Sequence, residues 1–183
     1  MSATRNACLD RAEADYVMFC DADDMFYNAC GLYIIFREID NEGFDSLTSK
    51  FIEEIKDIKT GQLAYITHDL DSIFVHGKVH RRQYLIDNNI RWNDDLTLHE
   101  DGYFNCLCQR LAPSLKYCTT PFYLWKWRDG SVCRSDPYWV LKTYDHMIKA
   151  NTALVQEFLR RNMVAEAQFY INYMVANAYI TMQ

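Results

Sequence analysis

The sequence predicts an α/β fold: a mixed β-sheet with flanking helices, followed by a C-terminal helical hairpin. Three observations lead to this prediction. An apolar run at 16–20 has the length of a strand and ends in a cluster of acids. Short β-rich pieces follow between 44 and 79. Two long segments, 138–161 and 164–182, carry apolar residues at helical spacing.

The N-terminal third gives a helix, a strand and a second helix. Residues 4–14 are rich in helix-forming side chains. The run at 16–20 is apolar on both faces, which predicts a central strand that is covered on both sides. Residues 29–39 have helix-like apolar spacing, and Gly43 is a stop signal.

The middle of the chain predicts a hairpin around a turn at Thr60 and Gly61, then a further strand. The remaining elements are expected, in order, as strands at 46–58, 62–68 and 72–79, a short helix at 81–89, an extended piece at 90–92, a helix at 99–111 and a strand at 116–127 that is interrupted at Pro121. The C-terminal hairpin should then pack on the sheet or on a partner.

Composition excludes several classes of protein. Half of the 183 residues are apolar and 15% are aromatic, which is enough for a core. The net charge is −6 and the basic residues are scattered, so nucleic acid is not an expected partner. No stretch approaches the roughly 20 apolar residues of a membrane span. We expect a cytoplasmic protein without a transmembrane segment, at most peripheral to a membrane. Seven cysteines without a CxxC pair predict reduced, mostly buried thiols.

The first candidate site is the acidic cluster at the end of the 16–20 strand, Asp21, Asp23 and Asp24. Ligands of open α/β sheets usually bind at this edge. Carboxylates this close repel one another, and a hard cation such as Mg²⁺ or Mn²⁺ would relieve the repulsion while holding substrate phosphates. The alternative is an exposed turn that caps the next helix through Asp24.

Three further motifs carry candidate residues. Asp101 follows His99 and Glu100 at the start of a predicted helix. If it faces the acidic cluster, Asp101 could act as a general base oriented by Glu100 or His99, although an ordinary helix N-terminal charge explains it too. The loop after the 116–127 strand brings Arg128, Ser131 and Arg134, a set that could close over phosphates or form a plain turn.

Strand alternation also places His76, Lys78 and His80 on one face of a predicted strand, with Gly77 allowing close backbone approach. A solvated sheet face explains this pattern equally well. Several aromatic residues between 92 and 139 could stack on sugars, but at least half are expected in the core, and none is assigned individually.

The order of these motifs resembles family 2 glycosyltransferases. The stretch RNACLDRAEADYVMFCDADD is similar to the helix, strand and DxD turn of that family. The stretch FVHGKVHRRQYLIDNNIRWNDDLTLHEDGYFN is similar to its acceptor-side region, which ends in an ED motif, and WKWRDGSVCR resembles its Arg-x-Gly-Ser loop. The resemblance covers residues 4–134 and implies a Rossmann-like GT-A fold, a nucleotide-sugar donor, a divalent metal and inversion at the anomeric carbon.

The resemblance also implies roles for individual residues. Asp23 would bind Mn²⁺ or Mg²⁺ directly, with Asp21 supporting the metal or the donor, and Asp101 would be the base beside Glu100. The remaining residues expected on the donor side are Asp24, Arg128, Ser131, Arg5 and Asn6. The residues expected on the acceptor or sugar side are His76, Lys78 and His99.

The sequence departs from the family pattern at its beginning. The family's first strands, which hold the nucleobase and ribose, are not present, so the 16–20 strand should expose an edge. We therefore expect a truncated GT-A domain at 1–135 and a helical extension at 136–183. A protein partner or a missing N-terminal segment would complete the fold.

These observations predict a metal-assisted glycosyltransferase that moves a sugar, most commonly from UDP, to the hydroxyl of a glycan or another acceptor with inversion. The alternative is a non-catalytic GT-A-derived module, structural or carbohydrate-binding, that needs a partner chain. A metal-dependent hydrolase built on the same acids is a third hypothesis, but it lacks further metal ligands at recognisable spacing.

Overall fold

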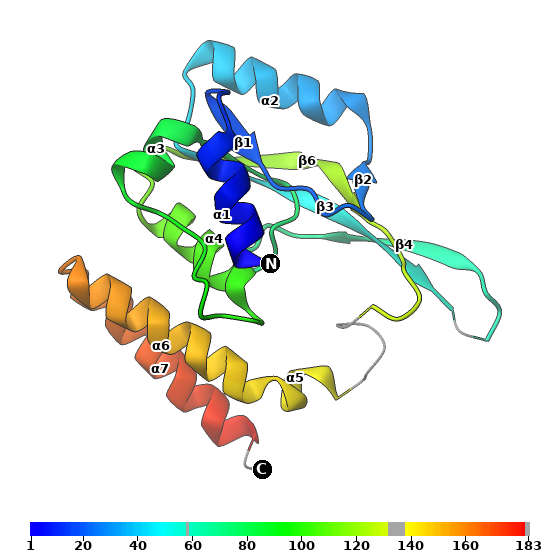
Figure 1. Ribbon diagram of the computed structural model, residues 1–183. Helices are drawn as coiled ribbons and strands as arrows, with labels where there is room; N and C mark the ends of the chain where they lie inside the picture. Colours follow the sequence, from blue (N-terminus) through cyan, green and yellow to red (C-terminus); the bar gives the residue numbers. More distant parts are fainter. Residues whose placement is uncertain (58, 132–137, 182–183) are drawn as a thin grey trace.

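The computed structural model describes residues 1–57, 59–131 and 138–181 (Figure 1). Six strands and seven helices occur in these residues. The helices are α1 (Ser2–Arg11), α2 (Ala29–Asn41), α3 (Arg82–Asp87), α4 (Glu100–Arg110), α5 (Trp139–Lys142), α6 (Tyr144–Arg160) and α7 (Val164–Thr181). The strands are β1 (Tyr16–Met18), β2 (Met25–Phe26), β3 (Ser46–Lys56), β4 (Leu63–His68), β5 (Lys78–Arg81) and β6 (Leu115–Trp125).

The strands form one mixed sheet in the order β1-β5-β3-β6-β2, with β4 pairing to β3 beside this path. The two long strands, β3 and β6, run parallel, and the other pairs are antiparallel. The β3–β6 register shifts between Ser49 and Phe51, opposite the part of β6 that contains Pro121. Proline lacks the N–H that a regular ladder needs, so the chain continues as one strand but the pairing is irregular there.

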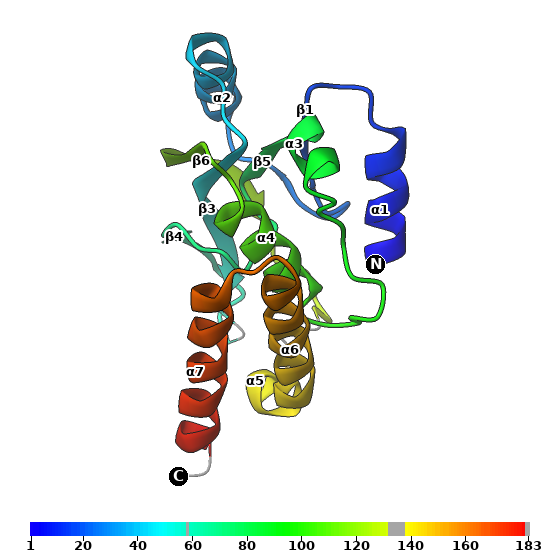
Figure 2. The same ribbon diagram turned by 90° about the vertical axis from the view of Figure 1, so that its left-hand side faces the viewer.

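Helices cover the sheet through two separate cores. On one face, α2 packs against β3, β5 and β6 through a cluster that includes Ile35, Leu47 and Phe122. The other cluster joins α1, α3, α4, α6 and α7. Figure 1 shows α2 apart from α1, α3 and α4, and Figure 2 shows α6 and α7 side by side beyond α4.

Helix α2 lies close to the sheet because of its first turn. The Asn28 side chain accepts a hydrogen bond from the Gly31 amide at 2.8 Å, the contact expected of an N-cap. A Cβ atom at Gly31 would lie 2.0 Å from Cβ of Phe122, so only glycine allows this approach to β6.

Most predicted elements are confirmed, including the 46–68 hairpin, the helix after the acidic cluster and the two long C-terminal segments. Three expectations are wrong. The strand after α1 is not central: among the described residues, β1 pairs only with β5 and ends the sheet, which agrees with the open edge expected from the missing first strands of the family pattern. Residues 72–77 are not strand, because Gly77 turns the backbone at φ 65° before β5 begins. The C-terminal hairpin packs on α4, not on the sheet.

Two smaller differences concern continuity. The 138–161 segment is broken at Thr143 into α5 and α6, and the short strand β2 lies inside what was expected to be turn.

None of the helices described is long and apolar enough to span a bilayer. The six cysteines in the described parts of the chain are free thiols, but only Cys106, Cys108 and Cys118 are buried, so the expectation of mostly buried thiols is wrong for these residues.

Candidate active site

The acidic turn between β1 and β2 separates its three carboxylates. Asp24 points inward, with 2% of its side chain exposed. It accepts hydrogen bonds from the Tyr123 hydroxyl at 2.6 Å and from the Lys126 amide at 2.9 Å. Burial raises the pKa of Asp24 despite these hydrogen bonds. Asp24 therefore anchors the turn to β6, and Asp21 and Asp23 remain more exposed.

Asp101 lies close to this turn, although it comes from the first turn of α4. A single guanidinium, that of Arg5 on α1, joins the two motifs. Its Nη2 donates to Oδ1 of Asp21 at 2.8 Å, and its Nη1 donates to Oδ1 of Asp101. The same Nη1 is 3.8 Å from Oε1 of Glu100. The structure thus brings one of the two acids predicted to bind metal, Asp21, together with the acid predicted to be the base.

The electrostatics of Asp101 suit a base. Burial raises the pKa of Asp101 to about 6, and the positive charge of Arg5 opposes this rise without cancelling it. A carboxyl group with this pKa is mostly ionised at pH 7, yet it is more basic than an ordinary aspartate. Proton transfer from a hydroxyl is the chemistry that such a group performs.

The loop after β6 closes the other side of the acidic turn. Nη1 of Arg128 lies 3.0 Å from Oδ2 of Asp23. The Trp127 amide donates to Oε1 of Glu54 at 3.1 Å, which ties the base of the loop to β3. The Ser131 amide donates to the Arg128 carbonyl at 3.3 Å. Arg128 is therefore placed beside the predicted metal ligands, while Arg134 lies outside the described residues.

Asn6 serves the frame of the site. Its side chain donates to the Trp92 carbonyl at 2.9 Å and accepts from the Trp92 amide at 3.0 Å. The Trp92 ring stacks on Phe104 of α4, with 4.2 Å between ring centroids. The guanidinium carbon of Arg5 lies over the Trp92 ring, 4.3 Å from its centroid. The donor-side role of Asn6 and Arg5 stays a prediction.

The residues predicted on the acceptor side are buried or half-buried. His76 lies among aromatic rings, 4.8 Å from the Tyr123 ring, and its Nδ1 is 3.9 Å from Oδ2 of Asp24. Lys78 is 1% exposed and lies 3.3 Å from Asp71, and burial lowers its pKa. His99 meets Thr143 at 3.1 Å, where α4 approaches α6. Their acceptor role stays a prediction.

The interpretation of 76, 78 and 80 as a solvated sheet face is wrong. His76, Lys78 and His80 are at most 4% exposed. Burial lowers the pKa of His80 to about 3, and its Nδ1 is 3.0 Å from the Ser46 hydroxyl. The bend at Gly77 breaks the alternation on which that interpretation depended.

The site contains two structural aromatics that had no individual assignment. Tyr123 holds Asp24 and also accepts a hydrogen bond from the Asp21 amide at 3.2 Å. Trp92 supports Arg5 and Asn6. Both are buried, so they act as core and not as sugar platforms. Their contacts come from residues far away in sequence, and no local pattern signals them.

Asp21 and Asp23 are the more exposed carboxylates of the acidic turn that could hold a divalent cation. Across the described ranges, no group of three or more His, Cys, Asp or Glu side chains is arranged to hold a metal. Two carboxylates nevertheless fit Mg²⁺ or Mn²⁺ in sites where substrate phosphates complete the coordination. Arg5 and Arg128 balance the charge of these two acids in the structure.

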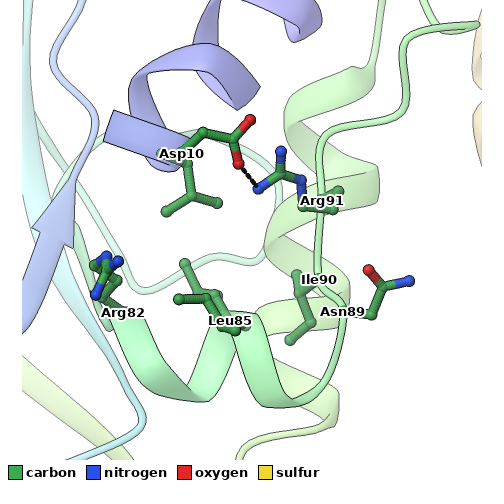
Figure 3. Close-up of a pocket in the computed structure, with 8 residues that line it drawn as sticks. Asp10, Arg82, Leu85, Asn89, Ile90 and Arg91 are labelled. Carbon is green, nitrogen blue, oxygen red and sulfur yellow. Dashed lines mark ion pairs between the residues drawn. The ribbon is translucent and has the colours of Figure 1, made fainter. Parts of the chain in front are cut away.

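A separate cavity of about 480 Å³ lies between the end of α1 and α3 (Figure 3). Asp10 and Arg91 face each other across its rim at 2.6 Å, and Leu85 and Ile90 contribute apolar surface. None of the predicted site residues lines this cavity. It gives no support to the candidate active site.

No protein-family model and no curated protein sequence matches the chain. Solved structures of TarS from S. aureus, a GT-A family 2 glycosyltransferase, do match. The complex of TarS 1–349 with UDP-GlcNAc gives a TM-score of 0.70 at 19% identity, covering 96% of this chain and 52% of that one. The complex with UDP gives a TM-score of 0.65 at 18% identity, covering 95% and 50%.

A third structure, of S. aureus TarS, gives a TM-score of 0.65 at 18% identity, covering 95% of this chain and 30% of that one. The chain therefore spans about half the length of TarS 1–349. The prediction of a GT-A fold is confirmed: the mixed sheet, its flanking helices and the paired C-terminal helices match the TarS domain.

Proposed function

We propose that the chain is the catalytic part of a metal-assisted, inverting glycosyltransferase. Its donor is a nucleotide sugar, most simply a UDP sugar, and its acceptor is a hydroxyl of a glycan or another alcohol. The observation that carries this proposal is the meeting of Asp21 and Asp101 at Arg5. The crystal structures of TarS with UDP and UDP-GlcNAc support the choice of donor class.

The reaction needs one displacement. The acceptor oxygen attacks the anomeric carbon, and the bond between that carbon and the diphosphate oxygen breaks. The hydroxyl proton passes to the Asp101 carboxylate, whose raised pKa makes it a suitable base. Because attack and departure occur on opposite faces of the sugar, a single displacement inverts the anomeric configuration.

The donor diphosphate would lie near Asp21, Asp23 and Arg128. Asp24 holds the acidic turn against β6 through its hydrogen bond with Tyr123. This contact fixes the backbone that carries the two exposed acids, Asp21 and Asp23. A divalent cation held by Asp21 and Asp23 would neutralise the charge that builds on the leaving diphosphate. The Arg128 guanidinium can add charge-assisted hydrogen bonds to phosphate oxygens from the loop side.

A non-catalytic GT-A module is the second candidate function. Two observations favour it. Asp21 and Asp23 are each paired with an arginine, so their charges are balanced by the protein itself. In the part of the chain that the structure describes, β1 pairs on one side only, and an open strand edge can accept a strand from a partner.

A transfer assay tests the proposed enzyme. The chain is incubated with UDP-GlcNAc, Mn²⁺ and a panel of glycan acceptors, and both UDP release and the glycosylated product are measured. Asp101→Asn should lower kcat at least about 100-fold, because general bases contribute that much or more. Asp10→Asn is the matched control, since Asp10 is an exposed acid on α1 paired with Arg91.

Three other outcomes separate the alternatives. Sugar release that does not need an acceptor would indicate a hydrolase. If the wild-type chain gives no product, thermal unfolding with saturating Mn²⁺ and UDP decides between an enzyme that lacks a component and a module. A ligand at 100 times its Kd stabilises the native state by about 2.7 kcal/mol, whereas no stabilisation would favour the non-catalytic module.

A further inference from the structure

Arg5 occupies an unusual position in the candidate active site. Its side chain is 9% exposed, and its guanidinium lies between acids from two different motifs. One terminal nitrogen binds Asp21 and the other binds Asp101. A guanidinium is a rigid planar fork, so two carboxylates bound to its two prongs are held at a defined separation and orientation.

We infer that Arg5 is a positioning residue, which orients Asp101 and holds it in register with Asp21, and that it does not bind the donor diphosphate. This inference rests on the proposed function. Both terminal nitrogens of Arg5 are engaged by carboxylates, and its face is engaged by the Trp92 ring. Arg128 lies beside the other exposed acid of the turn and takes the role of phosphate contact.

Aromatic stacking and side-chain hydrogen bonds form a frame around Arg5. Arg5 lies on the Trp92 ring, and that ring stacks on Phe104 with 7° between the ring planes. Phe104 is three residues after Asp101 in α4, so the two side chains share a face of the helix. The side chain of Asn6, one residue after Arg5, donates a hydrogen bond to the Trp92 carbonyl and accepts one from the Trp92 amide. Arg5 is therefore linked to Asp101 in two ways: by a direct hydrogen bond, and through Trp92 and Phe104, which lies in the same helix as Asp101.

The charges in this frame explain why one guanidinium is needed. Asp21, Glu100 and Asp101 all lie within 4 Å of Arg5, and Glu100 is buried. Without the guanidinium, three partly desolvated carboxylates would face one another, and their side chains would turn apart. Asp101 would lose its orientation, while Asp21 would become free to bind a cation.

The inference separates two kinetic effects. Arg5→Gln should lower kcat at least about 100-fold, while the KM for the donor changes less than about threefold, because only transition-state alignment is lost. Donor-free binding of Mn²⁺, followed by the electron paramagnetic resonance signal of the free ion, should be as tight as in the wild type or tighter. Arg5→Lys keeps the charge but not the fork, so its kcat should lie between those of Arg5→Gln and the wild type.

Arg91→Gln is the matched control, because Arg91 pairs with α1 through Asp10 and does not touch the acids of the site. It should behave like the wild type. Melting curves by circular dichroism check that each variant folds, and Arg5→Lys provides the kinetic test if Arg5→Gln does not. A raised donor KM with unchanged kcat in the Arg5 variants would overturn the inference, because it would show that Arg5 binds the donor. Wild-type kcat in Arg5→Gln would overturn it as well.

A readout without activity distinguishes this inference from the proposed function. The melting temperatures of Arg5→Lys, Asp101→Asn and the double variant form a double-mutant cycle. The losses should be clearly less than additive, because both changes break the same contact. Strict additivity would overturn the inference even in an active enzyme. An inactive wild-type chain that Mn²⁺ and UDP do not stabilise, but in which Arg5 and Asp101 are strongly coupled, would instead overturn the proposed function and leave the Arg5–Asp101 coupling established.

Discussion

The pH dependence of sugar transfer follows from the position of Asp101. Burial raises the pKa of this carboxyl group from 3.8 to about 6, with the Arg5 charge opposing the rise. If Asp101 is the base, the rate follows its ionised fraction, which is about 0.9 at pH 7 and about 0.1 at pH 5. The kcat/KM for the acceptor should therefore fall about tenfold between these two pH values and level off above pH 7.

The assay is UDP release at saturating donor and Mn²⁺ over pH 4.5 to 8, with Asp101→Asn as the control. The residual rate of Asp101→Asn should lack the inflection near pH 6. An equal rate for the wild type at pH 5 and pH 7 would refute a base with a pKa near 6, because an aspartate with its ordinary pKa is ionised at both values.

The raised pKa of Asp101 also affects the stability of the fold, which should fall with rising pH where the rate of sugar transfer rises. The folded state binds the Asp101 proton more tightly than the unfolded state does, so this group favours folding most below about pH 4. As pH rises from about 4 to about 6, that contribution is lost, and two pKa units correspond to about 3 kcal/mol. The difference in unfolding free energy between the wild type and Asp101→Asn, measured by urea titration, should change by about this amount across that range. A constant difference would contradict the raised pKa.

Three further predictions concern other parts of the molecule. Arg128→Met should weaken Mn²⁺-dependent UDP binding about tenfold or more in a calorimetric titration, because charge-assisted hydrogen bonds to phosphate contribute about 1.5–3 kcal/mol. Unchanged affinity would argue against a phosphate contact. Phe158→Ala should lower the free energy of unfolding in urea by about 3–5 kcal/mol, since Phe158 is 0% exposed. Leu159→Ala, at an exposed position, should lower it far less, and equal losses in the two variants would refute this placement of α6. Gly31→Ala should lower the melting temperature by several degrees because its Cβ would overlap β6. Gly102→Ala should be nearly neutral, because its Cβ would lie 3.9 Å from Cγ2 of Ile73, and the reverse order would contradict the packing of α2.

Much of the architecture was predictable because its signals are local. The β3–β4 hairpin follows from a Thr60-Gly61 turn between two β-rich segments, and the structure has Gly61 at φ 72° in that turn. The long helices follow from apolar spacing. The strand order was less accessible: the apolar run at 16–20 favoured a central strand, but the described sheet ends at β1. Partial burial against aromatic rings accounts for its apolar composition, since Phe19 contacts Trp92 and Phe104.

The candidate site was predictable as a set of motifs but not as a set of contacts. The DxD and ED acids were selected from their order, and the structure brings Asp21 and Asp101 together. That Asp24 turns inward to Tyr123 could not be read from the sequence, because the partner lies on β6. The bend at Gly77 likewise changes which way His76 points, and a period-two pattern cannot anticipate a bend.

Calorimetric titration of the chain with UDP in the presence of Mn²⁺ tests the central claim most directly, with Asp23→Ala as the comparison. The proposed donor site predicts binding that requires the metal and disappears in the variant, because Asp23 is an exposed acid of the DxD turn beside Arg128. Metal-independent binding, equal binding by the variant, or no binding by the wild-type chain would contradict the claim that these acids form a donor site.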